Sequence, residues 1–591
     1  MPGARWRGTL GAVVGLVLGV LVLGPALAPG YLLRYDLVHV PRLPIGDRVL
    51  GIDGSVPRAV PNDLVVALLS TVVPGWVVQK AWLLGSLVLG AAGAARLLPS
   101  RTGALAAAVA FTWNPWVGER IGIGHWGFLL GYATLPWVAA AALRTARGET
   151  GARAALLVWL VVASLGGSTA GLLSAGPAVL VLVVGEGGRA LRSRAVDVGL
   201  VLTTGIGSAA VWWWPFLLAV PSVADPAGVR VFALTSDTVL GPAGSALLGG
   251  GIWNDAVVLA DRRSWIVAVV ALLAVLGALG AAVRWPGPLR ARSWLGVVAA
   301  GLLGLVVALV THLPGGVDAL TWIVTHVPGG GLLRDGQKFL AWWVLVLALA
   351  AGRAAEVARG LPTARHAARP MVLGVVVAAL PVVTLPSLGW GHLGAWRAHP
   401  YPPEVTRTAA SLSAAPPGAV AVLPWQTYRR YRWNDGTVVL DPWNRLVDRE
   451  VISSDGLPVD GVVVAGEDAR AAAIGRALQN GEGIDAMRAA GVRWVLVQED
   501  QPAPVGTTPD RRELDALPVV HRAGPFAVHD LGEPAQIREG RWPERLFGLG
   551  VSLVTALAVL GYRLGTWAWH TVRSRPRRGT IPGSPPGGAA T

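Results

Sequence analysis

The chain has 591 residues, of which 53% are hydrophobic and only 14% are charged, whereas soluble proteins carry about 25% charged residues. The formal net charge is +15, but the basic residues stand in short clusters between long apolar runs. This pattern is typical of a membrane protein and argues against nucleic-acid binding. The chain has no cysteine, which excludes disulfides, thiol catalysis and cysteine-ligated metals.

Apolar segments along the whole chain predict about twelve transmembrane helices. The segments lie at about 9–29, 76–95, 102–117, 125–143, 154–166, 169–185, 196–219, 264–283, 293–311, 337–352, 370–388 and 545–562. The first follows Arg5 and Arg7 and ends near Ala28, so it also resembles a signal peptide with a cleavage site. Because the apolar run is about twenty residues long, an uncleaved first helix is the favoured reading.

Arginine clusters orient these helices. Every second connection is rich in arginine and poor in acids, as in Arg144, Arg147 and Arg153, whereas the other long connections mix both signs. Since positive loops stay inside the cell, the sequence predicts a multi-pass protein of a bacterial plasma membrane with both termini cytoplasmic. The main outer loops are then expected at 30–75, 220–262 and 312–335.

The region 390–543 differs from the rest of the chain and predicts a small α/β domain outside the cytoplasm. Strands are expected at 419–423, 462–464, 494–498 and 526–530, and helices at 469–478 and 484–490. The fold class is thus an α-helical polytopic membrane protein with an α/β extracytoplasmic domain before the last helix. The expected organisation is a membrane domain over 1–389, the outer domain over 390–543, the last transmembrane helix over 544–572 and a basic, disordered cytoplasmic tail over 573–591.

Asp36 stands a few residues beyond the first helix, in the sequence YLLRYD. A carboxylate at this depth can reach the head group of a lipid-linked substrate and take a proton as a general base. Alternatively, Asp36 is a solvated acid or pairs with Arg34 or Arg42.

Glu119, Arg120 and His125 are crowded into the short turn between the third and fourth predicted helices. Arg120 could bind a phosphate, and Glu119 could orient a hydroxyl or an ion. The alternative is a local Glu–Arg pair that caps the turn.

The segment GGGLLRDGQKF at 329–339 enters the tenth predicted helix from outside. Glycines followed by Arg334 and Lys338 at a helix start suit an anion such as a lipid phosphate. Lys80 is the only other lysine of the chain and stands at a comparable outer helix start, although chance also explains two such lysines.

Two further sets of residues have side chains of the types that bind metals or sugars. His312 and His326 lack metal-ligand spacing, so no metal site is predicted from them and a structural role is expected. Trp425, Tyr428 and Trp433 form an aromatic and arginine-rich stretch that suits sugar stacking, and equally suits docking on lipid or on the membrane domain.

This layout resembles the GT-C class of membrane glycosyltransferases. The segment LRDGQKF at 333–339 is similar to an Arg-x-x-x-Lys-Phe element of large actinobacterial arabinofuranosyltransferases, and the segments at 423–425 and 491–495 are similar to parts of their outer domains. The resemblance implies a polyprenyl-phosphate sugar donor, a cell-envelope glycan or lipid as acceptor, and no certain cofactor beyond a possible divalent cation.

Under this resemblance Asp36 is the catalytic acid, and Arg334 and Lys338, with Lys80, hold the donor phosphate. A second acid is expected in the outer loops, for which Asp53, Asp63 and Glu119 are candidates. The first loop lacks two adjacent acids, which departs from the family pattern. The main alternative is a non-catalytic transporter or assembly factor of envelope biogenesis, and a third is a relative that binds lipid-linked sugars without turnover.

Overall fold

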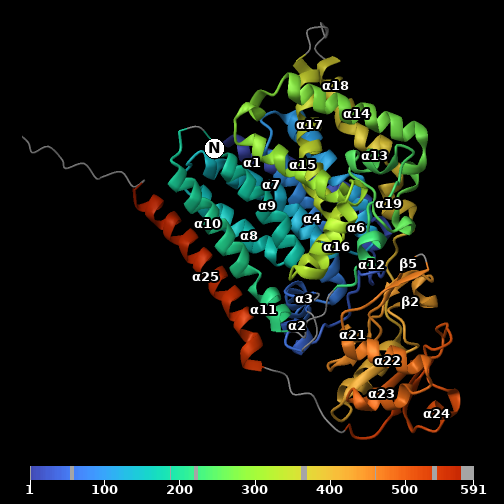
Figure 1. Ribbon diagram of the computed structural model, residues 1–591. Helices are drawn as coiled ribbons and strands as arrows, with labels where there is room; N and C mark the ends of the chain where they lie inside the picture. The colour runs from blue at the N-terminus through green and yellow to red at the C-terminus, as the bar shows by residue number, and fades with distance from the viewer. Residues whose placement is uncertain are drawn as a thin grey trace, which may run out of the picture.

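The computed structural model describes residues 2–573 apart from 54–56, 58, 187, 219–223, 361–368, 460 and 535–541. A bundle of helices forms one part, and a small domain of strands and short helices lies against one end of it (Figure 1). The predicted cytoplasmic tail covers 573–591, and all of it except Arg573 lies outside the described residues.

All twelve apolar segments form helices. Their bounds are α1 Pro2–Leu23, α4 Gly75–Arg96, α5 Arg101–Thr112, α7 Trp126–Ala146, α8 Ala152–Ser164, α9 Ser168–Val184, α10 Leu191–Ser208 with α11 Ala210–Leu218, α14 Trp265–Arg284, α15 Trp294–Leu309, α17 Leu340–Gly360, α18 Arg369–Thr384 and α25 Trp542–Arg573.

Fewer than twelve of these helices are long enough to cross a membrane. Within the described ranges, seven helices are long and apolar enough to cross a bilayer, or nine if two bent pairs each count as one span. The pair α10 and α11 bends by 60°, and the chain bends by 69° between α18 and the segment 386–393. The helices α8 and α9 have only 13 and 17 residues, and α5 has 12. The expected count of about twelve spans is therefore not confirmed.

The third predicted helix is two helices. Helix α5 ends at Thr112, and α6 (Pro115–Gly122) starts after Asn114, whose side chain accepts a hydrogen bond from Val117 N at 3.0 Å. A side-chain acceptor at this position starts a new helix. Glu119 and Arg120 lie on α6, and both side chains are buried.

Helix α1, which leads into the first outer loop, packs closely on α4. A Cβ added at Gly11 would lie 2.6 Å from Ala91 O, and one added at Gly15 would lie 2.8 Å from Val88 Cα. Small residues of this kind let two helices approach within a membrane. The close contact fixes where the first outer loop begins.

The domain that the sequence predicts to lie outside the cytoplasm, and that keeps the name outer domain for this reason, is built on a mixed sheet of five strands in the order β4-β1-β7-β9-β8. The strand β1 is parallel to β4 and β7, whereas β9 is antiparallel to β7 and β8. The bounds are β1 Ala419–Leu423, β4 Val451–Ile452, β7 Val492–Gln498, β8 Val519–Ala523 and β9 Phe526–Asp530. All five residues of β1 are buried, as expected for a central strand covered on both faces.

The expected elements of this domain are confirmed with one difference. The helices α22 (Ala469–Gln479) and α23 (Gly483–Ala489) pack on the sheet where helices were predicted. The segment Val462–Val464 is a strand, β6, but it pairs with β5 (Leu457–Val459) in a separate hairpin rather than joining the main sheet.

A second hairpin, β2 (Tyr428–Arg430) with β3 (Val438–Leu440), ties the outer domain to the first outer loop. Tyr35 N donates to Val438 O at 2.7 Å, and Leu440 N donates to Tyr35 O at 2.8 Å. The first loop thus continues the hairpin through Tyr35 and brings Asp36 between the two domains.

Candidate functional site

Backbone contacts fix the loop that carries Asp36. Asp36 N donates to Ile123 O at 3.2 Å, and Arg34 Nε donates to Gly122 O at 2.7 Å. Gly124 has a φ of +87°, and a Cβ at this position would lie 2.2 Å from Leu37 N. A glycine is therefore required where the turn after α6 passes under the first loop.

The Asp36 carboxylate is contacted by one side chain from each domain. The hydroxyl of Tyr428, on β2, donates to Asp36 Oδ1 at 2.8 Å. On the membrane side, His125 Nε2 lies 3.7 Å from Asp36 Oδ2. The Asp36 side chain is 41% exposed, so the carboxylate is held in place while it stays open to an incoming ligand.

The contact of the other ring nitrogen of His125, Nδ1, shows which nitrogen carries the ring proton. Arg120 Nη1 lies 3.1 Å from His125 Nδ1. A guanidinium can only donate, so Nδ1 is the acceptor and the ring proton sits on Nε2, which faces Asp36. Burial, and next the charge of Arg120, hold the pKa of His125 well below its usual range, so the ring is neutral.

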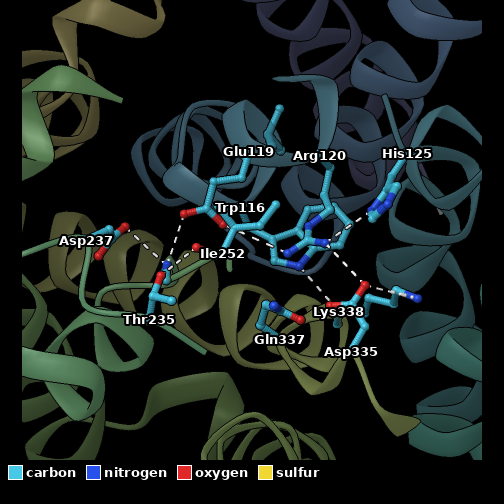
Figure 2. Close-up of polar contacts among 12 residues, drawn as sticks. Trp116, Glu119, Arg120, His125, Thr235, Asp237, Ile252, Asp335, Gln337 and Lys338 are labelled. Atoms are coloured by element: carbon cyan, nitrogen blue, oxygen red, sulfur yellow. Dashed lines mark hydrogen bonds and ion pairs between the residues drawn. The ribbon is translucent and has the colours of Figure 1, made fainter. Parts of the chain in front are cut away.

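Beyond His125, the polar contacts continue to the entry of α17. Arg120 Nη1 lies 4.0 Å from Asp335 Oδ2, and Lys338 Nζ lies 3.0 Å from the same oxygen (Figure 2). Lys338 also lies over the ring of Phe128, at 4.8 Å from its centroid. Burial would raise the pKa of Asp335, but Lys338 and Arg120 hold that pKa below its usual value. The name Asp36 cluster is used below for the residues Asp36, His125, Arg120, Asp335 and Lys338.

Several buried polar atoms around Arg120 in the Asp36 cluster have no hydrogen-bond partner among the described residues. Arg120 is fully buried, yet its Nε and Nη2 have no hydrogen-bond partner among the described residues. The same holds for Asp335 Oδ1 and for Gln337 Oε1. Buried polar atoms in folded proteins are nearly always hydrogen-bonded, so these atoms make the surroundings of Arg120 a candidate for ligand binding.

Glu119 belongs to a different group. Glu119 Oε1 and Asp237 Oδ2 both accept from Gly251 N, at 3.0 and 3.1 Å. Arg262 holds Asp237 through two hydrogen bonds of 2.8 Å. Burial, and next the neighbouring Asp237, raise the pKa of Glu119 to about 8. Glu119 forms a long ion pair of 4.0 Å with Arg120, which is the local pair given as the alternative, while the cap at the start of α6 is Asn114.

The predicted phosphate-binding residues do not all meet. Lys338 lies in the Asp36 cluster, whereas Arg334 lies 3.8 Å from Glu467 of the outer domain and over the ring of Phe232. Lys80 is buried in α4, where it donates to Gln79 Oε1 at 3.2 Å. No contact between Lys80 and Arg334 or Lys338 is found in the part of the chain that the structure describes. The grouping of Lys80 with these two residues therefore stays a prediction.

The alternative second acids Asp63 and Asp53 lie among other charged groups. Asp63 forms an ion pair of 2.9 Å with Arg445 of the outer domain, and burial raises the pKa of Asp63. Burial, followed by the charge of Asp53, raises the pKa of Asp47, which places Asp53 near that loop acid.

Tyr428 is the aromatic residue that reaches Asp36. Trp425 is buried in the core of the outer domain beside α22. Trp433 stacks on Tyr431, with ring centroids 4.9 Å apart, and contacts Tyr401. Their positions favour packing over sugar contact for Trp425 and Trp433.

The histidines of the third outer loop make local contacts. His312 Nε2 lies 2.8 Å from Leu234 O, and His326 Nδ1 lies 2.9 Å from Trp322 O. Over the described ranges, no three His, Asp or Glu side chains are grouped so that they could hold a metal ion.

The fold is shared with solved membrane glycosyltransferase structures. No family model and no curated protein matches the sequence. The arabinofuranosyltransferase AftD from Mycobacteria, determined by single-particle cryo-EM, aligns with a TM-score of 0.59 at 18% identity over 92% of this chain and 42% of that one. Two classes of a mutant of AftD align with TM-scores of 0.53 and 0.52, at 17% and 16% identity, over 89% and 92% of this chain and 41% and 44% of theirs.

These alignments concern the fold, and the chain spans less than half the length of the AftD structures. The resemblance to arabinofuranosyltransferase-type membrane proteins, first noted from short motifs, is thereby confirmed at the level of the fold.

Proposed function

We propose that this chain is a membrane glycosyltransferase that moves a sugar from a polyprenyl-phosphate donor to a glycan or lipid acceptor of the cell envelope, on the outer face of the plasma membrane. The observation that carries the proposal is the half-exposed Asp36 carboxylate, held by Tyr428 and His125 at one end of a buried row of cations. The fold shared with AftD supports the same class of reaction.

In the proposed step, an acceptor hydroxyl attacks the anomeric carbon of the donor sugar. Asp36 takes the hydroxyl proton as the new glycosidic bond forms, and the bond between the anomeric carbon and the phosphate oxygen breaks. The electron pair leaves with the polyprenyl phosphate. The hydrogen bond from Tyr428 orients one oxygen of Asp36, and His125 Nε2 lies 3.7 Å from the other oxygen.

Lys338 is the cation best suited to the departing phosphate. It stands at the start of a membrane span, and its side chain is 14% exposed beside the unsatisfied N–H groups of Arg120. An ammonium and a buried guanidinium stabilise the charge that develops on the leaving group. Arg334 is proposed to hold the donor from the side of the outer domain, where Glu467 restrains it.

The decisive experiment is Asp36→Asn in the purified, detergent-solubilised protein, assayed with radiolabelled polyprenyl-phosphate sugars. Loss of a general base is expected to lower transfer by about 10²- to 10⁴-fold. Asp255→Asn is the matched control, because Asp255 is an outer-loop acid that is 82% exposed and pairs with Arg263 at the surface.

Transfer by Asp36→Asn equal to that of the parent would remove Asp36 from the mechanism. No turnover by the parent across a broad donor panel, with binding retained, would favour the non-catalytic alternatives. A titration with EDTA tests whether the transfer requires a divalent cation.

A further inference from the structure

A polar cavity lies where the turn between α7 and α8 meets the last helix, α25. Its volume is about 580 Å³, and its wall includes Glu149, Thr150, Arg153, Arg189, Tyr562 and Thr566. The arginine-rich loops on this side of the bundle are the ones that the sequence predicts to be cytoplasmic.

Two arginines of the cavity wall are fixed by one buried acid. Arg153 lies 2.6 Å and Arg189 lies 2.7 Å from the carboxylate of Asp197, whose side chain is fully buried. Arg189 also donates to Thr145 O at 2.6 Å. A guanidinium has five N–H donors, so both side chains are held rigidly and keep donors for a ligand.

The surroundings of the cavity are positively charged. The charged residues of the wall are Arg153, Arg189 and Glu149, and Asp197 lies behind the two arginines. Three further arginines lie next to the wall: Arg144 and Arg147 pair with Glu149, and Arg563 donates to Gly151 O. The hydroxyl groups of Thr150 and Tyr562 on the same wall add uncharged donors, whereas the Thr566 hydroxyl already donates to Arg563 O at 2.8 Å. Arginine forks together with hydroxyl donors suit a phosphate group.

The cavity opens beside a surface that lipid would cover. Helix α25 runs along one edge of the bundle next to α10 and α8 (Figure 1). The part of α25 that is long and apolar enough to span a membrane is only 17% buried. Leu557, Leu560 and Leu564 on α25 are 66%, 51% and 63% exposed. Helical spacing places these leucines on the face of α25 opposite Tyr562 and Thr566, so they mark the depth of the apolar layer and not the wall of the cavity. A lipid beside α25 would hold its acyl chains at the depth of the leucines and its head group at the depth of the cavity.

We propose that this cavity binds the phosphate of an anionic phospholipid, with the phosphate on Arg153 and Arg189 and the acyl chains along α25. Basic pockets between helices at the cytoplasmic side of a membrane are suited to such head groups. The site is independent of the transferase reaction, and it would fix the last helix against the bundle.

The test is native mass spectrometry of the detergent-solubilised full chain titrated with phosphatidylglycerol. Phosphatidylcholine with the same acyl chains and inorganic phosphate serve as the other arms. The parent protein is expected to retain phosphatidylglycerol in preference to phosphatidylcholine, and inorganic phosphate is not expected to displace it. Arg153→Gln is expected to weaken phosphatidylglycerol binding by roughly tenfold to a hundredfold, because it removes charge-assisted hydrogen bonds.

Arg290→Gln is the matched control, since Arg290 is an exposed arginine of another predicted inner loop and its loss changes the net charge equally. If Arg153→Gln does not fold, Thr566→Trp fills the cavity from the exposed helix and is expected to have the same effect. Equal retention of phosphatidylglycerol by the parent, the cavity variant and the control would overturn the proposal. Equal binding of phosphatidylcholine, or displacement by inorganic phosphate, would overturn it as well.

Discussion

Arg120 and Arg262 are two buried arginines on either side of Glu119, and they are paired in opposite ways. Arg262 makes two hydrogen bonds of 2.8 Å to Asp237 and a third to Ser245 O at 3.3 Å. Arg120 lies 4.0 Å from both Glu119 and Asp335, and two of its nitrogens have no partner among the described residues.

The difference separates a structural charge from one that is available to a ligand. A bidentate pair such as Arg262 with Asp237 satisfies both groups and fixes the outer loop at 237–262 against α6. The loosely paired Arg120 leaves positive charge next to Lys338 and His125, in the row of groups that ends at Asp36. The two arginines therefore predict different consequences for the same substitution.

The largest effect is expected for Arg262→Met. The change leaves Asp237 buried without its cation, which costs about 3 to 5 kcal/mol of folding free energy. The apparent melting temperature in detergent, together with the free energy of unfolding from an SDS titration, measures this loss. Asp237→Asn combined with Arg262→Met should recover much of the stability, because the double variant removes both charges. Full stability of Arg262→Met alone would contradict the assignment of a closed structural pair.

A smaller effect, on activity rather than folding, is expected for Lys338→Gln. Loss of a charged hydrogen bond to the donor phosphate costs about 1.5 to 3 kcal/mol, or roughly tenfold to a hundredfold in kcat/KM. Asp335 keeps Arg120 as a neighbouring cation, so the fold should be retained. Lys80→Gln is the control, since Lys80 lies with Gln79 in α4. Equal losses in the two variants would contradict the separate positions of the two lysines.

Arg120→Met is expected to destabilise the protein by less than about 2 kcal/mol, because Lys338 stays within 3.0 Å of Asp335 and a methionine fills the buried space. The same unfolding measurement used for Arg262→Met gives the direct contrast. Transfer activity should fall while the fold persists, because His125 Nδ1 loses its donor. A stability loss as large as that of Arg262→Met would show that both arginines are structural.

Much of the fold followed from local patterns in the sequence. Apolar runs and arginine-rich connections located all twelve helical segments, because each pattern is contiguous in the chain. The break between α5 and α6 at Asn114 was missed, although the sequence Asn-Pro is a strong helix start. The bend between α10 and α11 was also missed, because α11 contains Pro215 within an unbroken apolar run.

The candidate site was only partly accessible from sequence. Asp36, His125, Arg120 and Lys338 could be named because each stands beside an outer helix end, but their contacts join segments far apart in the chain. Asp335, three residues before Lys338, was inside the quoted motif and was not assigned. Tyr428 lies 392 positions from Asp36, and no local pattern connects them. Their meeting depends on the hairpin that continues through Tyr35.

The smallest effect tests the protonation of His125. Because burial and Arg120 lower its pKa, native His125 stays neutral where an unfolded histidine, with a pKa of about 6.5, takes up a proton. The native state then gains stability as pH rises, and that contribution is present above about pH 6.5 and is lost as the pH falls toward the lowered value.

For each pH unit below about 6.5, the loss from this one group approaches 1.4 kcal/mol. His125→Gln removes the contribution, so unfolding measured at pH 7.5 and at pH 5.5 should differ less in the variant than in the parent by about 1 kcal/mol. His39 is also buried with a lowered pKa and is present in both proteins, so it cancels in the comparison. An identical pH dependence in the two proteins would mean that His125 is protonated in the native state, and Arg120 could not then donate to its Nδ1.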